Sequence, residues 1–479
     1  MKIIDYLKKS VTNNPKKIAL VFEDNSLTFE DLWNEVKDFT LCLSSFNSQN
    51  VISLMSENSS HFIITYLGII NSGKIAHLIP PEISEKNLIE QINSSNSSLI
   101  ICSDTVYTKI SQYSQIDIPI IRFDQITQKR DDLQVGFDKN QIAYLIYTSG
   151  TTSNPKGVGI SHSMVEFTTK NIVSVLKYSE SDIDVLPLPL FHSFGLGCLH
   201  TSLVNGSTLV LLKNSNNLQN ILDAIKKYNA TTLAVIPATL TKFLQINESE
   251  LVDYFSNIRL IITNSTKIPI HTIQNFKKIC SNGNLATYYG LTEASRSTFM
   301  IFDDESSHDE SVGKPAPKIQ IKIVYEDSDN SNSGEIWIKG KNVISKYWNN
   351  LSADKKIIDG WLKTGDLGYF DDDGYLYLTG RTDEMINVGG EKVMPEEIEN
   401  IIKQIPGVEN VAAFGINHDF FGQVVKVNII KSQNSILDKS TILKFCMKNL
   451  ERHKIPTKID FVTKIPQTEY GKVKRFMLK

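Results

Sequence analysis

The sequence predicts an α/β protein with a large N-terminal domain of parallel sheets covered by helices and a small α+β C-terminal domain. Three observations lead to this fold class. Short apolar runs separated by amphipathic segments recur up to about Ser311, which is typical of buried strands alternating with helices. From there the apolar runs are divided by tight turns, as in β-hairpins. After Gly380 helical and strand patterns mix again.

The N-terminal stretch is predicted to form a helix, a strand and a second helix. Ile3 to Val11 is apolar at helical spacing, and Ile18 to Phe22 is a short strand. Phe29 to Phe39 is a second helix, with Thr28 and Asp31 at capping-box spacing at its start. The elements expected after it are the strands Val51–Leu54, Leu99–Cys102, Ile118–Ile121, Ala143–Tyr147, Thr208–Leu212, Thr232–Ile236 and Leu260–Ile262 and the helix Leu218–Tyr228. The polar run Asn93–Ser98 is predicted to be a surface loop.

The second half of the chain is predicted to form a β-rich segment followed by a small C-terminal domain. The expected hairpin strands are Ile319–Tyr325, Gly334–Lys339, Gly368–Phe370 and Tyr375–Thr379. The elements expected in the C-terminal domain are the helices Glu396–Gln404 and Thr441–Leu450 and the strands Val408–Gly415 and Val424–Ile430. About 100 residues is a usual domain size. We therefore predict an N-terminal domain over 1–380, a hinge at 381–383 and a C-terminal domain over 384–479.

Composition excludes several classes of function. Lys plus Arg is 50 and Asp plus Glu is 53, so the net charge of −3 does not suit a nucleic-acid-binding protein. The five cysteines lack C-x-x-C spacing, which suggests neither a disulfide framework nor a zinc site. The N-terminus lacks an apolar signal-peptide core, and the apolar stretches are too short to span a bilayer. We expect a cytoplasmic protein, monomeric or homodimeric.

The sharpest motif follows the strand Ala143–Tyr147. Each residue from Thr148 to Ser153 is glycine or carries a hydroxyl group, and Pro155, Lys156 and Gly157 follow closely. Glycine lets backbone N–H groups approach an anion, hydroxyls add donors, and lysine adds charge. This pattern predicts phosphate binding, although it is not the G-x-x-x-x-G-K-[ST] motif of P-loop NTPases. The alternative is an ordinary polar loop.

Four further motifs are ordinary when taken singly. An aromatic residue beside glycine can stack on a base and a nearby acid can hold Mg²⁺, as in Tyr288-Tyr289-Gly290-Leu291-Thr292-Glu293. An aspartate in a glycine-flanked turn can accept both ribose hydroxyls. The remaining motifs are Thr364-Gly365-Asp366 followed by Gly380-Arg381-Thr382-Asp383, the turn Gly389-Gly390-Glu391 before a helix, and Tyr470-Gly471-Lys472 near the C-terminus.

In this order the motifs resemble the adenylate-forming superfamily, which includes acyl- and aryl-CoA synthetases, adenylation domains of peptide synthetases and firefly luciferases. The resemblance runs from Leu27 to Lys472. It implies a large N-terminal domain with a small β-barrel-like subdomain, followed by a mobile C-terminal domain. It also implies two steps: a carboxylate attacks the α-phosphate of ATP to give acyl-AMP and pyrophosphate, and a thiol then takes the acyl group.

The resemblance also implies a role for each matching residue. Lys472, Thr292, Glu293 and His192 are expected to be catalytic, with Lys472 stabilising the adenylation transition state. ATP would be held by Thr148, Ser149, Gly150, Thr151, Thr152, Lys156, Ser265, Tyr288, Tyr289, Gly290, Asp366 and Arg381. Asp383 would be the hinge, and Gly389, Gly390 and Glu391 would form the loop used in thioester formation. Mg²⁺ would be held by Glu293 and Thr152.

The substrate is expected to be a carboxylic acid other than an α-amino acid. The segment Pro189 to Gly195 resembles the Phe-His segment of acyl- and aryl-CoA synthetases, in which the histidine lies beside the carboxylate. It lacks the aspartate that amino-acid adenylation domains use, and an unpaired buried ammonium would be costly. The expected substrate-binding residues are His192, Phe194, Gly195, Ile236, Gly290 and Ser297.

Two features of the sequence, one run and one arginine, bear on the substrate pocket. The family has a Gly-Gly or Gly-Ala-Pro run where this chain has Thr263-Asn264-Ser265-Thr266, which changes the surroundings of adenine and the pocket. Arg296 is expected to be a surface arginine. Its alternative role is to pair with a second carboxylate on the substrate.

Four functions remain open from the sequence. The chain is expected to transfer the acyl group to CoA. A stand-alone ligase would instead load a phosphopantetheinyl acyl or peptidyl carrier protein, because both acceptors present the same thiol. A non-catalytic homologue would only bind nucleotide, but Lys472 and Glu293 are both present. The motifs do not exclude a luciferase-type oxygenase, although no residue calls for one.

Overall fold

The computed structural model describes residues 1–43, 50–113, 115–126, 141–148, 156–264, 266–303, 308–325, 333–350, 352–389, 391–418, 420–433, 435–467 and 473–478. The chain forms two compact units, one of Met1–Gln320 with Ile338–Leu362 and one of Ile321–Trp337 with Lys363–Lys479. None of the described helices is both long enough and apolar enough to cross a membrane.

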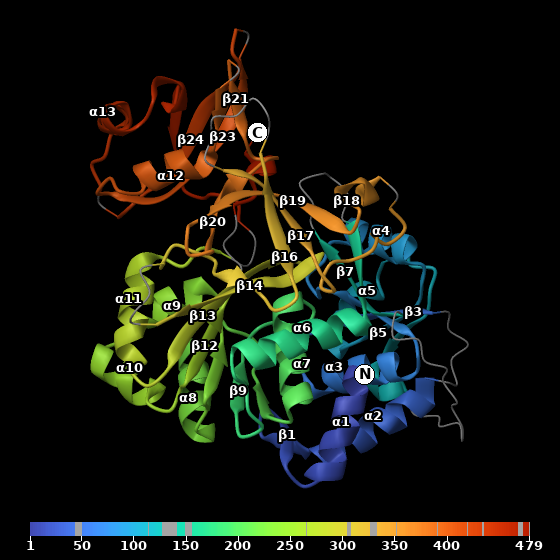
Figure 1. The fold of residues 1–479 in the computed structure, drawn as a ribbon. Helices are drawn as coiled ribbons and strands as arrows, with labels where there is room; N and C mark the ends of the chain where they lie inside the picture. Colours follow the sequence, from blue (N-terminus) through green and yellow to red (C-terminus); the bar gives the residue numbers. More distant parts are fainter. Residues whose placement is uncertain are drawn as a thin grey trace. The chain divides into compact units, whose positions relative to one another are not determined.

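The first unit contains a nine-stranded sheet that is parallel in its centre (Figure 1). Its order is β15 (Lys314–Pro315), β14 (Ala294–Phe302), β13 (Asn284–Leu291), β12 (Leu260–Thr263), β11 (Thr232–Ala234), β9 (Ile183–Leu186), β10 (Thr208–Leu211), β1 (Ile18–Phe22) and β2 (Asn25–Thr28). The strands from β13 to β1 run parallel, and β2, β14 and β15 pair antiparallel at the two edges. The central strands are almost wholly buried, as expected for a sheet covered on both faces.

A six-stranded sheet forms the other half of this unit. Its order is β6 (Ile120–Arg122), β5 (Ser97–Cys102), β3 (Val51–Met55), β4 (Ile75–Ile79), β7 (Ile142–Thr148) and β8 (Lys156–Ser161). All neighbours are parallel except β7 and β8, which form an antiparallel hairpin. The short strand β18 (Ile357–Ile358) does not belong to this sheet; it pairs with Trp361 and Leu362 at the start of β19 (Trp361–Phe370).

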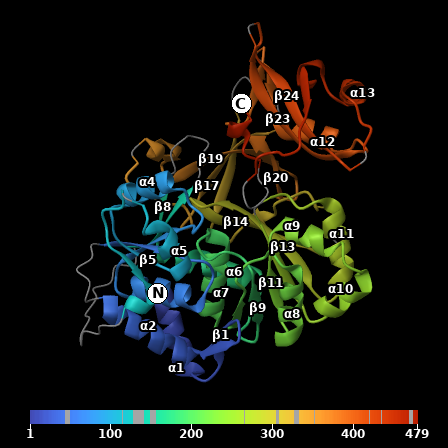
Figure 2. The ribbon, with the colours of Figure 1, turned by 180° about the vertical axis from the view of Figure 1, so that it is seen from behind.

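Helices lie between the two sheets and on their outer faces. α6 (His162–Val175) contacts strands of both sheets, while α7 (Ser193–Asn205) lies on the large sheet and α3 (Ser60–Asn71) on the small one. α1 (Ile3–Asn13) contacts all three, and α2 (Phe29–Leu43) packs on α1 and α3. On the far side of the large sheet lie α8 (Leu218–Tyr228), α9 (Pro237–Phe243), α10 (Glu248–Phe255) and α11 (Ile270–Ile279), as Figures 1 and 2 show. α4 (Glu85–Ser95) and α5 (Asp104–Ile110) bury apolar side chains against the small sheet.

The second unit contains two small sheets. In the first, β17 (Gly334–Lys339) lies between β16 (Gln320–Val324) and β19 (Trp361–Phe370), and β20 (Leu376–Arg381) pairs with β19. In the second, the order is β22 (Glu391–Val393), β21 (Ile386–Val388), β24 (Gly422–Lys431) and β23 (Val408–His418), with β25 (Lys458–Phe461) beside β24. α12 (Pro395–Ile402) and α13 (Lys439–Asn449) close an apolar core over this sheet.

The predicted fold class is confirmed, and most expected elements are present. The Thr28–Asp31 capping box forms, since each residue's backbone N–H donates to the other's side chain at 3.1 Å. The prediction of a surface loop at Asn93–Ser98 is wrong. Its residues form the last turn of α4 and the start of β5, and the Ser95 and Ser97 hydroxyls are buried and hydrogen-bonded to each other at 2.8 Å. The hinge at 381–383 stays a prediction; the compact units divide at 320/321 and 362/363 and around 337/338.

Four buried histidines make stability depend on pH. Burial lowers the pKa of His77 and His200 to about 3 and that of His162 and His192 to about 4. The unfolded chain therefore binds more protons than the native chain between about pH 4 and the ordinary value of 6.5. Stability is complete above pH 6.5 and falls as the pH is lowered, by about 2 kcal/mol per imidazole at pH 5.

This dependence is measurable by urea unfolding between pH 7.5 and pH 5. We expect the free energy of unfolding to fall steeply below about pH 6.5. His77→Gln should reduce that slope, whereas replacement of the exposed His271 with glutamine should leave it unchanged. The same slope in wild type and His77→Gln would contradict the prediction.

Candidate active site

The predicted phosphate loop joins β7 to β8. Thr148 lies opposite Lys156 and Tyr147 opposite Gly157 in this antiparallel pair, so both ends of the loop leave from the same end of the hairpin. Lys156 is half-buried. The loop residues Ser149, Gly150, Thr151 and Thr152 lie outside the described residues, and their roles stay predictions.

The segment from Ile344 to Trp348 connects this hairpin to Glu293. The Trp348 backbone N–H donates to the Gly157 carbonyl at 2.8 Å. The Ile344 N–H donates to the Glu293 carbonyl at 3.0 Å, and the Tyr347 hydroxyl donates to Glu293 Oε1 at 3.1 Å. One short segment thus holds together the base of the phosphate hairpin and the predicted Mg²⁺ ligand.

The hydroxyl group of Tyr347 stays protonated, which lets it donate to Glu293. Burial raises the pKa of its phenol, and the Glu293 carboxylate raises that pKa further. Tyr347 therefore remains a hydrogen-bond donor at neutral pH and orients one carboxylate oxygen of Glu293. Among the described residues no group of three or more metal-binding side chains occurs. A single oriented carboxylate fits Mg²⁺, which proteins bind through one or two carboxylates together with substrate phosphates.

The motif around Glu293 forms the end of β13 and the turn into β14. Tyr288 and Tyr289 point to opposite faces of the sheet, as successive strand residues do. Tyr289 is 8% exposed and its N–H donates to Thr298 Oγ1 at 3.2 Å. Gly290 is required here, because a Cβ atom at this position would lie 2.5 Å from the backbone nitrogen of Arg296. The stacking of Tyr289 on adenine and the contact of Thr292 with the α-phosphate stay predictions.

The run Thr263–Thr266 differs from the glycine-rich run of the family, and Asn264 within it links two neighbouring strands. The Asn264 side chain donates from Nδ2 to the Tyr288 carbonyl at 2.9 Å, which links the end of β12 to the adjacent motif strand. Thr263 is fully buried at the end of β12. Ser265 lies outside the described residues.

His192 stands at the start of α7. It is the N-cap residue of this helix, and burial lowers its pKa to about 4, so the imidazole is neutral at pH 7. Gly195 allows the helix to approach the chain before it, since a Cβ atom would lie 2.2 Å from the Pro189 carbonyl oxygen. A neutral imidazole beside the substrate carboxylate remains the predicted arrangement.

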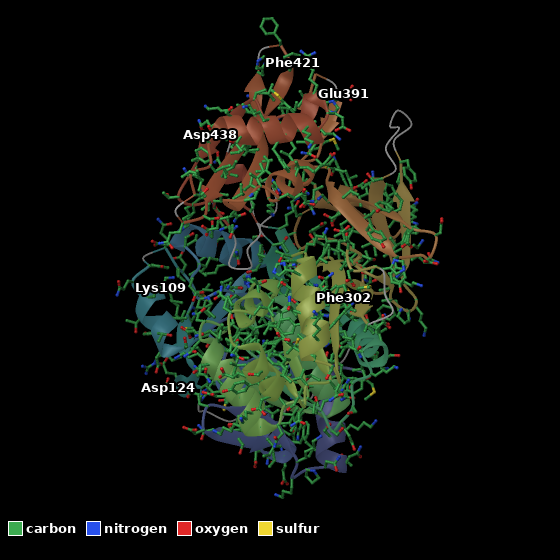
Figure 3. The ribbon with its side chains drawn as sticks, turned by 90° about the vertical axis from the view of Figure 1, so that its left-hand side faces the viewer. Lys109, Asp124, Phe302, Glu391, Phe421 and Asp438 are labelled. Atoms are coloured by element: carbon green, nitrogen blue, oxygen red, sulfur yellow. The ribbon has the colours of Figure 1, made fainter. Side chains whose placement is uncertain are left out.

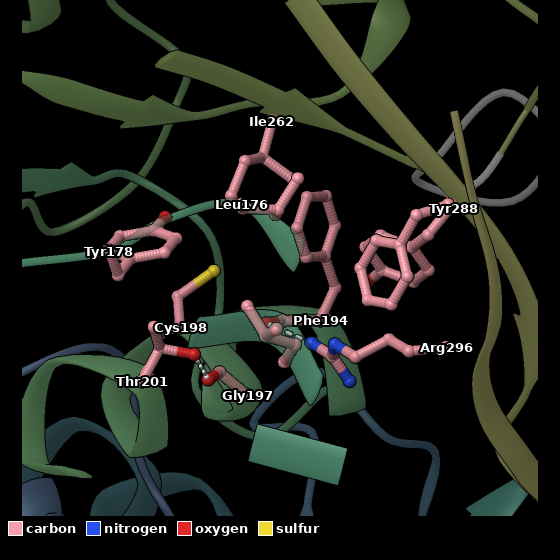
Figure 4. A pocket seen from close by; sticks show the side chains of 11 residues that line it. Leu176, Tyr178, Phe194, Gly197, Cys198, Thr201, Ile262, Tyr288 and Arg296 are labelled. Atoms are coloured by element: carbon pink, nitrogen blue, oxygen red, sulfur yellow. Dashed lines mark hydrogen bonds between the residues drawn. The ribbon is translucent and has the colours of Figure 1, made fainter. Parts of the chain in front are cut away.

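An apolar pocket lies beside α7, shown in Figure 4. Phe194 and Tyr288 form its aromatic wall, with ring centroids 5.5 Å apart at 88°. Its empty volume is about 240 Å³, including its open side. The lining residues are Ile172, Leu176, Tyr178, Phe194, Gly197, Cys198, Thr201, Ile262, Tyr288, Arg296 and Phe299. Of the expected substrate-binding residues, Phe194 lines this pocket, whereas His192, Gly195, Ile236, Gly290 and Ser297 do not.

A more polar pocket lies next to it, with an empty volume of about 390 Å³ that includes its open side. It contains Thr292, and it shares Ile172, Gly197 and Arg296 with the apolar pocket. Its other lining residues are Tyr144, Ile160, Met164, Val165, Thr168, Thr169, Ser193, His200, Ser295 and Asn342. The expectation that Arg296 is a surface residue is wrong, because its side chain is only 5% exposed. The β13–β14 turn carries it inward against the start of α7.

In the second unit Asp366 and Arg381 meet. They are direct partners across β19 and β20, and the Arg381 guanidinium forms ion pairs with both Asp366 and Asp383, the latter at 2.9 Å. Burial by itself would lower the pKa of Arg381, but the neighbouring carboxylates outweigh it and raise the pKa. The guanidinium thereby orients the Asp366 carboxylate, and the binding of ribose by this pair stays a prediction.

The predicted thioester loop lies beside the tip of the β23–β24 hairpin, as the labels of Glu391 and Phe421 in Figure 3 show. Gly389 has a φ of +63° and its N–H donates to the Phe421 carbonyl at 2.8 Å. Glu391 is exposed at the start of β22. Gly390 and Lys472 lie outside the described residues, although Gln467 and Val473 on either side of the lysine segment pair with each other.

Sequence reasoning missed Asn342, Leu176 and Tyr178, which line the pockets, and Tyr347 and Trp348, which contact Glu293 and Gly157. Tyr347, Trp348 and Asn342 come from a segment that carries no motif, and Leu176 and Tyr178 follow α6 in an ordinary loop. Hydrogen bonds and packing between distant segments place them, so no local signal pointed to them.

Comparison with known proteins agrees with this geometry. The AMP-binding enzyme family model matches residues 7–348, and the AMP-binding enzyme C-terminal domain matches residues 397–472. The chain is 26% identical to the indoleacetate–CoA ligase of Aromatoleum aromaticum, covering 99% of this chain and 97% of that protein. It is 27% identical to the 2-succinylbenzoate–CoA ligase of Listeria monocytogenes, covering 99% and 98%.

A solved structure extends the likeness to three dimensions. The o-succinylbenzoate CoA synthetase of Bacillus subtilis, in complex with its acyl-adenylate intermediate, has a TM-score of 0.88 and 26% identity, covering 99% of this chain and 97% of that one. The same enzyme has been solved with ATP and magnesium ion. With a family model over most of its length and the same fold, this chain belongs to the AMP-binding enzyme family, the adenylate-forming superfamily that its motifs resemble.

Proposed function

We propose that this chain activates a carboxylic acid other than an α-amino acid with ATP and transfers the acyl group to CoA. It is an AMP-forming acid–thiol ligase that uses Mg²⁺. In the first step a carboxylate oxygen bonds to the α-phosphorus and the bond to pyrophosphate breaks. In the second step the CoA sulfur bonds to the acyl carbon, the bond to AMP breaks, and the thiol proton is released.

The observation that carries this proposal is the joint placement of Glu293 and the phosphate hairpin by Tyr347 and Trp348. Nucleotidyl transfer depends mainly on positioning and charge stabilisation, so oriented donors and cations suffice without a protein nucleophile. Lys156 and the hydroxyls of the hairpin loop would bind the phosphates. Glu293 would hold Mg²⁺, which supplies charge neutralisation to the phosphates when bound. Asp366, oriented by Arg381, would bind the ribose.

The pocket linings support the exclusion of amino acids. Neither pocket is lined by an acidic side chain among the described residues. Asp184, the nearest acid before His192, is buried and accepts hydrogen bonds from Ser202, Ser207 and Thr232. A substrate ammonium would therefore lack a counter-charge, and burying it would be costly.

Further parts of the proposal concern the assembly around the site. The hinge at 381–383 would let the C-terminal domain bring first Lys472 and then the Gly389–Glu391 loop to the reacting atoms. Such closure would also exclude water from the hydrolysable acyl adenylate. A cytoplasmic location fits an enzyme that consumes ATP and CoA. Loading of a phosphopantetheinyl carrier protein is the second candidate function, since the same thiol chemistry serves both acceptors.

The test is product analysis by mass spectrometry. The protein, ATP and Mg²⁺ are incubated with fatty, aryl, dicarboxylic and amino acids, alone, with CoA, or with an acyl carrier protein bearing phosphopantetheine. We expect acyl-AMP without an acceptor and acyl-CoA with CoA, for one class of non-amino acid. Acyl-AMP that reacts only with the carrier protein would favour the second candidate. No AMP with any acid, or activity with amino acids only, would overturn the proposal.

A further inference from the structure

We propose that Arg296 binds a second carboxylate of the acid substrate, so that this chain activates a dicarboxylic acid. The inference rests on the proposed function and names its substrate class. It starts from the position of Arg296, which lies on β14 and lines both pockets of the first unit. In Figure 4 its guanidinium reaches across the pocket toward Gly197 and Phe194.

Arg296 differs from the other arginines of the described residues in its partners. The four others that are not fully exposed each pair with at least one carboxylate: Arg122, Arg259, Arg381 and Arg475. Arg296 donates only to neutral oxygens, namely Ser295 Oγ at 2.7 Å and the carbonyls of Ser193 and Phe194 at 3.2 and 3.3 Å. Within the described chain no acid lies within ion-pair distance of it.

A buried cation without a counter-ion is costly, and a protein retains one where a ligand supplies the charge. The guanidinium stays protonated throughout the pH range of enzymes and offers five donors in a planar fork. The face of Tyr288 lies 4.8 Å from the guanidinium carbon and holds its plane, but an aromatic ring does not neutralise it. A carboxylate is the anion that matches this fork in a bidentate manner.

The backbone around Arg296 is built to hold it in the pocket. Its φ of +53° is in the left-handed region, which is unfavourable for a side chain of this size and is typical of functional positions. Gly197 on α7 leaves the space that the guanidinium occupies, since a Cβ atom there would lie 2.0 Å from Nη2. Gly197 thus admits the side chain of Arg296, and Gly290 admits its backbone, since a Cβ atom at Gly290 would lie 2.5 Å from the Arg296 backbone nitrogen.

The polar pocket gives the two carboxylates separate places. Thr292, the predicted α-phosphate contact, lines the same pocket as Arg296. The reacting carboxylate would lie at the Thr292 end, and the second carboxylate at the Arg296 end, among Ser193, Ser295 and Asn342. The acids in the relatives' names include a dicarboxylate, 2-succinylbenzoate, and a monocarboxylate, indoleacetate, so the argument for a diacid comes from Arg296 and not from the relatives.

The test compares dicarboxylic acids with their half methyl esters in pyrophosphate release from ATP. Each pair has one reacting carboxylate and differs only in the charge at the other end. We expect wild type to prefer one linear or aromatic diacid over its half ester by about a hundredfold in kcat/KM, the size of a charge-assisted bidentate contact. Arg296→Met should abolish this preference by raising KM for the diacid, with kcat for both compounds within about threefold of wild type. Arg296→Lys should retain part of it.

The controls separate a binding role from a structural one. Arg122→Met removes a half-exposed arginine that pairs with Asp104 and Asp124, and it should keep the diacid preference. The KM for ATP should be unchanged in Arg296→Met. Equal wild-type activity on diacid and half ester, or an equal loss on both in Arg296→Met, would overturn the inference while the ligase function stands. The absence of pyrophosphate release with every acid would instead refute the proposed function.

Discussion

Replacing Lys472 with alanine is expected to slow acyl-adenylate formation by about a hundredfold to a thousandfold. Loss of one preorganised donor to the transition state has an effect of this size. Transfer of the acyl group from preformed acyl-AMP to CoA should stay within about threefold of wild type, because Lys472 is assigned to the first step only. The measurement is single-turnover formation of acyl-AMP without CoA, followed by mass spectrometry, together with the separate transfer reaction.

Lys474→Ala is the matched control, since Lys474 lies in the same C-terminal segment and its N–H donates to the Pro466 carbonyl at 2.9 Å. That contact involves the backbone, so the variant should fold and retain both half-reactions. An equal loss of both half-reactions in Lys472→Ala would indicate a general structural effect. An unchanged adenylation rate would show that Lys472 does not act in this step.

Replacing Glu293 with glutamine is expected to lower the maximal adenylation rate by about a hundredfold and to raise the Mg²⁺ concentration needed for half of it. The amide keeps an oxygen ligand but loses the charge that a hard cation prefers. Tyr347→Phe should have a smaller effect of the same kind, about tenfold, because it removes the hydroxyl that orients Glu293 Oε1 from 3.1 Å. The measurement is the initial rate of pyrophosphate release as a function of Mg²⁺ at saturating ATP.

Tyr325→Phe serves as the control for Tyr347→Phe, since Tyr325 is 53% exposed. It should leave the Mg²⁺ dependence as in wild type. If Tyr347→Phe lowers the rate without shifting the Mg²⁺ dependence, Tyr347 does not act through Glu293. If Glu293→Gln leaves both quantities unchanged, the metal is held by other residues.

Much of the fold and part of the site were predictable because they depend on local sequence. The apolar runs of the central strands bury both faces wherever they occur, so the run Thr208–Leu212 indicated β10 without knowledge of its neighbours. The resemblance implied that Asp366 and Arg381 act as a pair; the two residues are register partners in the structure, and their binding of ribose stays a prediction. The family was predictable because five local motifs occur in a fixed order.

Other features depended on contacts that no local pattern records. The serines of Asn93–Ser98 are polar and looked exposed, yet Ser97 is buried because β5 lies between β3 and β6. Tyr347 carries no motif and reaches Glu293 only because the chain returns beside the β13–β14 turn.

Arg296 shows the division between sequence and structure most clearly. The sequence by itself determined the kind of chemistry, a carboxylate activated at the α-phosphate, because residue types and their order set that chemistry. Only the tertiary structure decided that this arginine is buried, because the residue type is normally exposed and its burial depends on the distant helix α7, with Gly197, lying against its side chain. The motifs therefore determine the reaction, whereas the packing of segments far apart in the chain determines which side chains line the pockets.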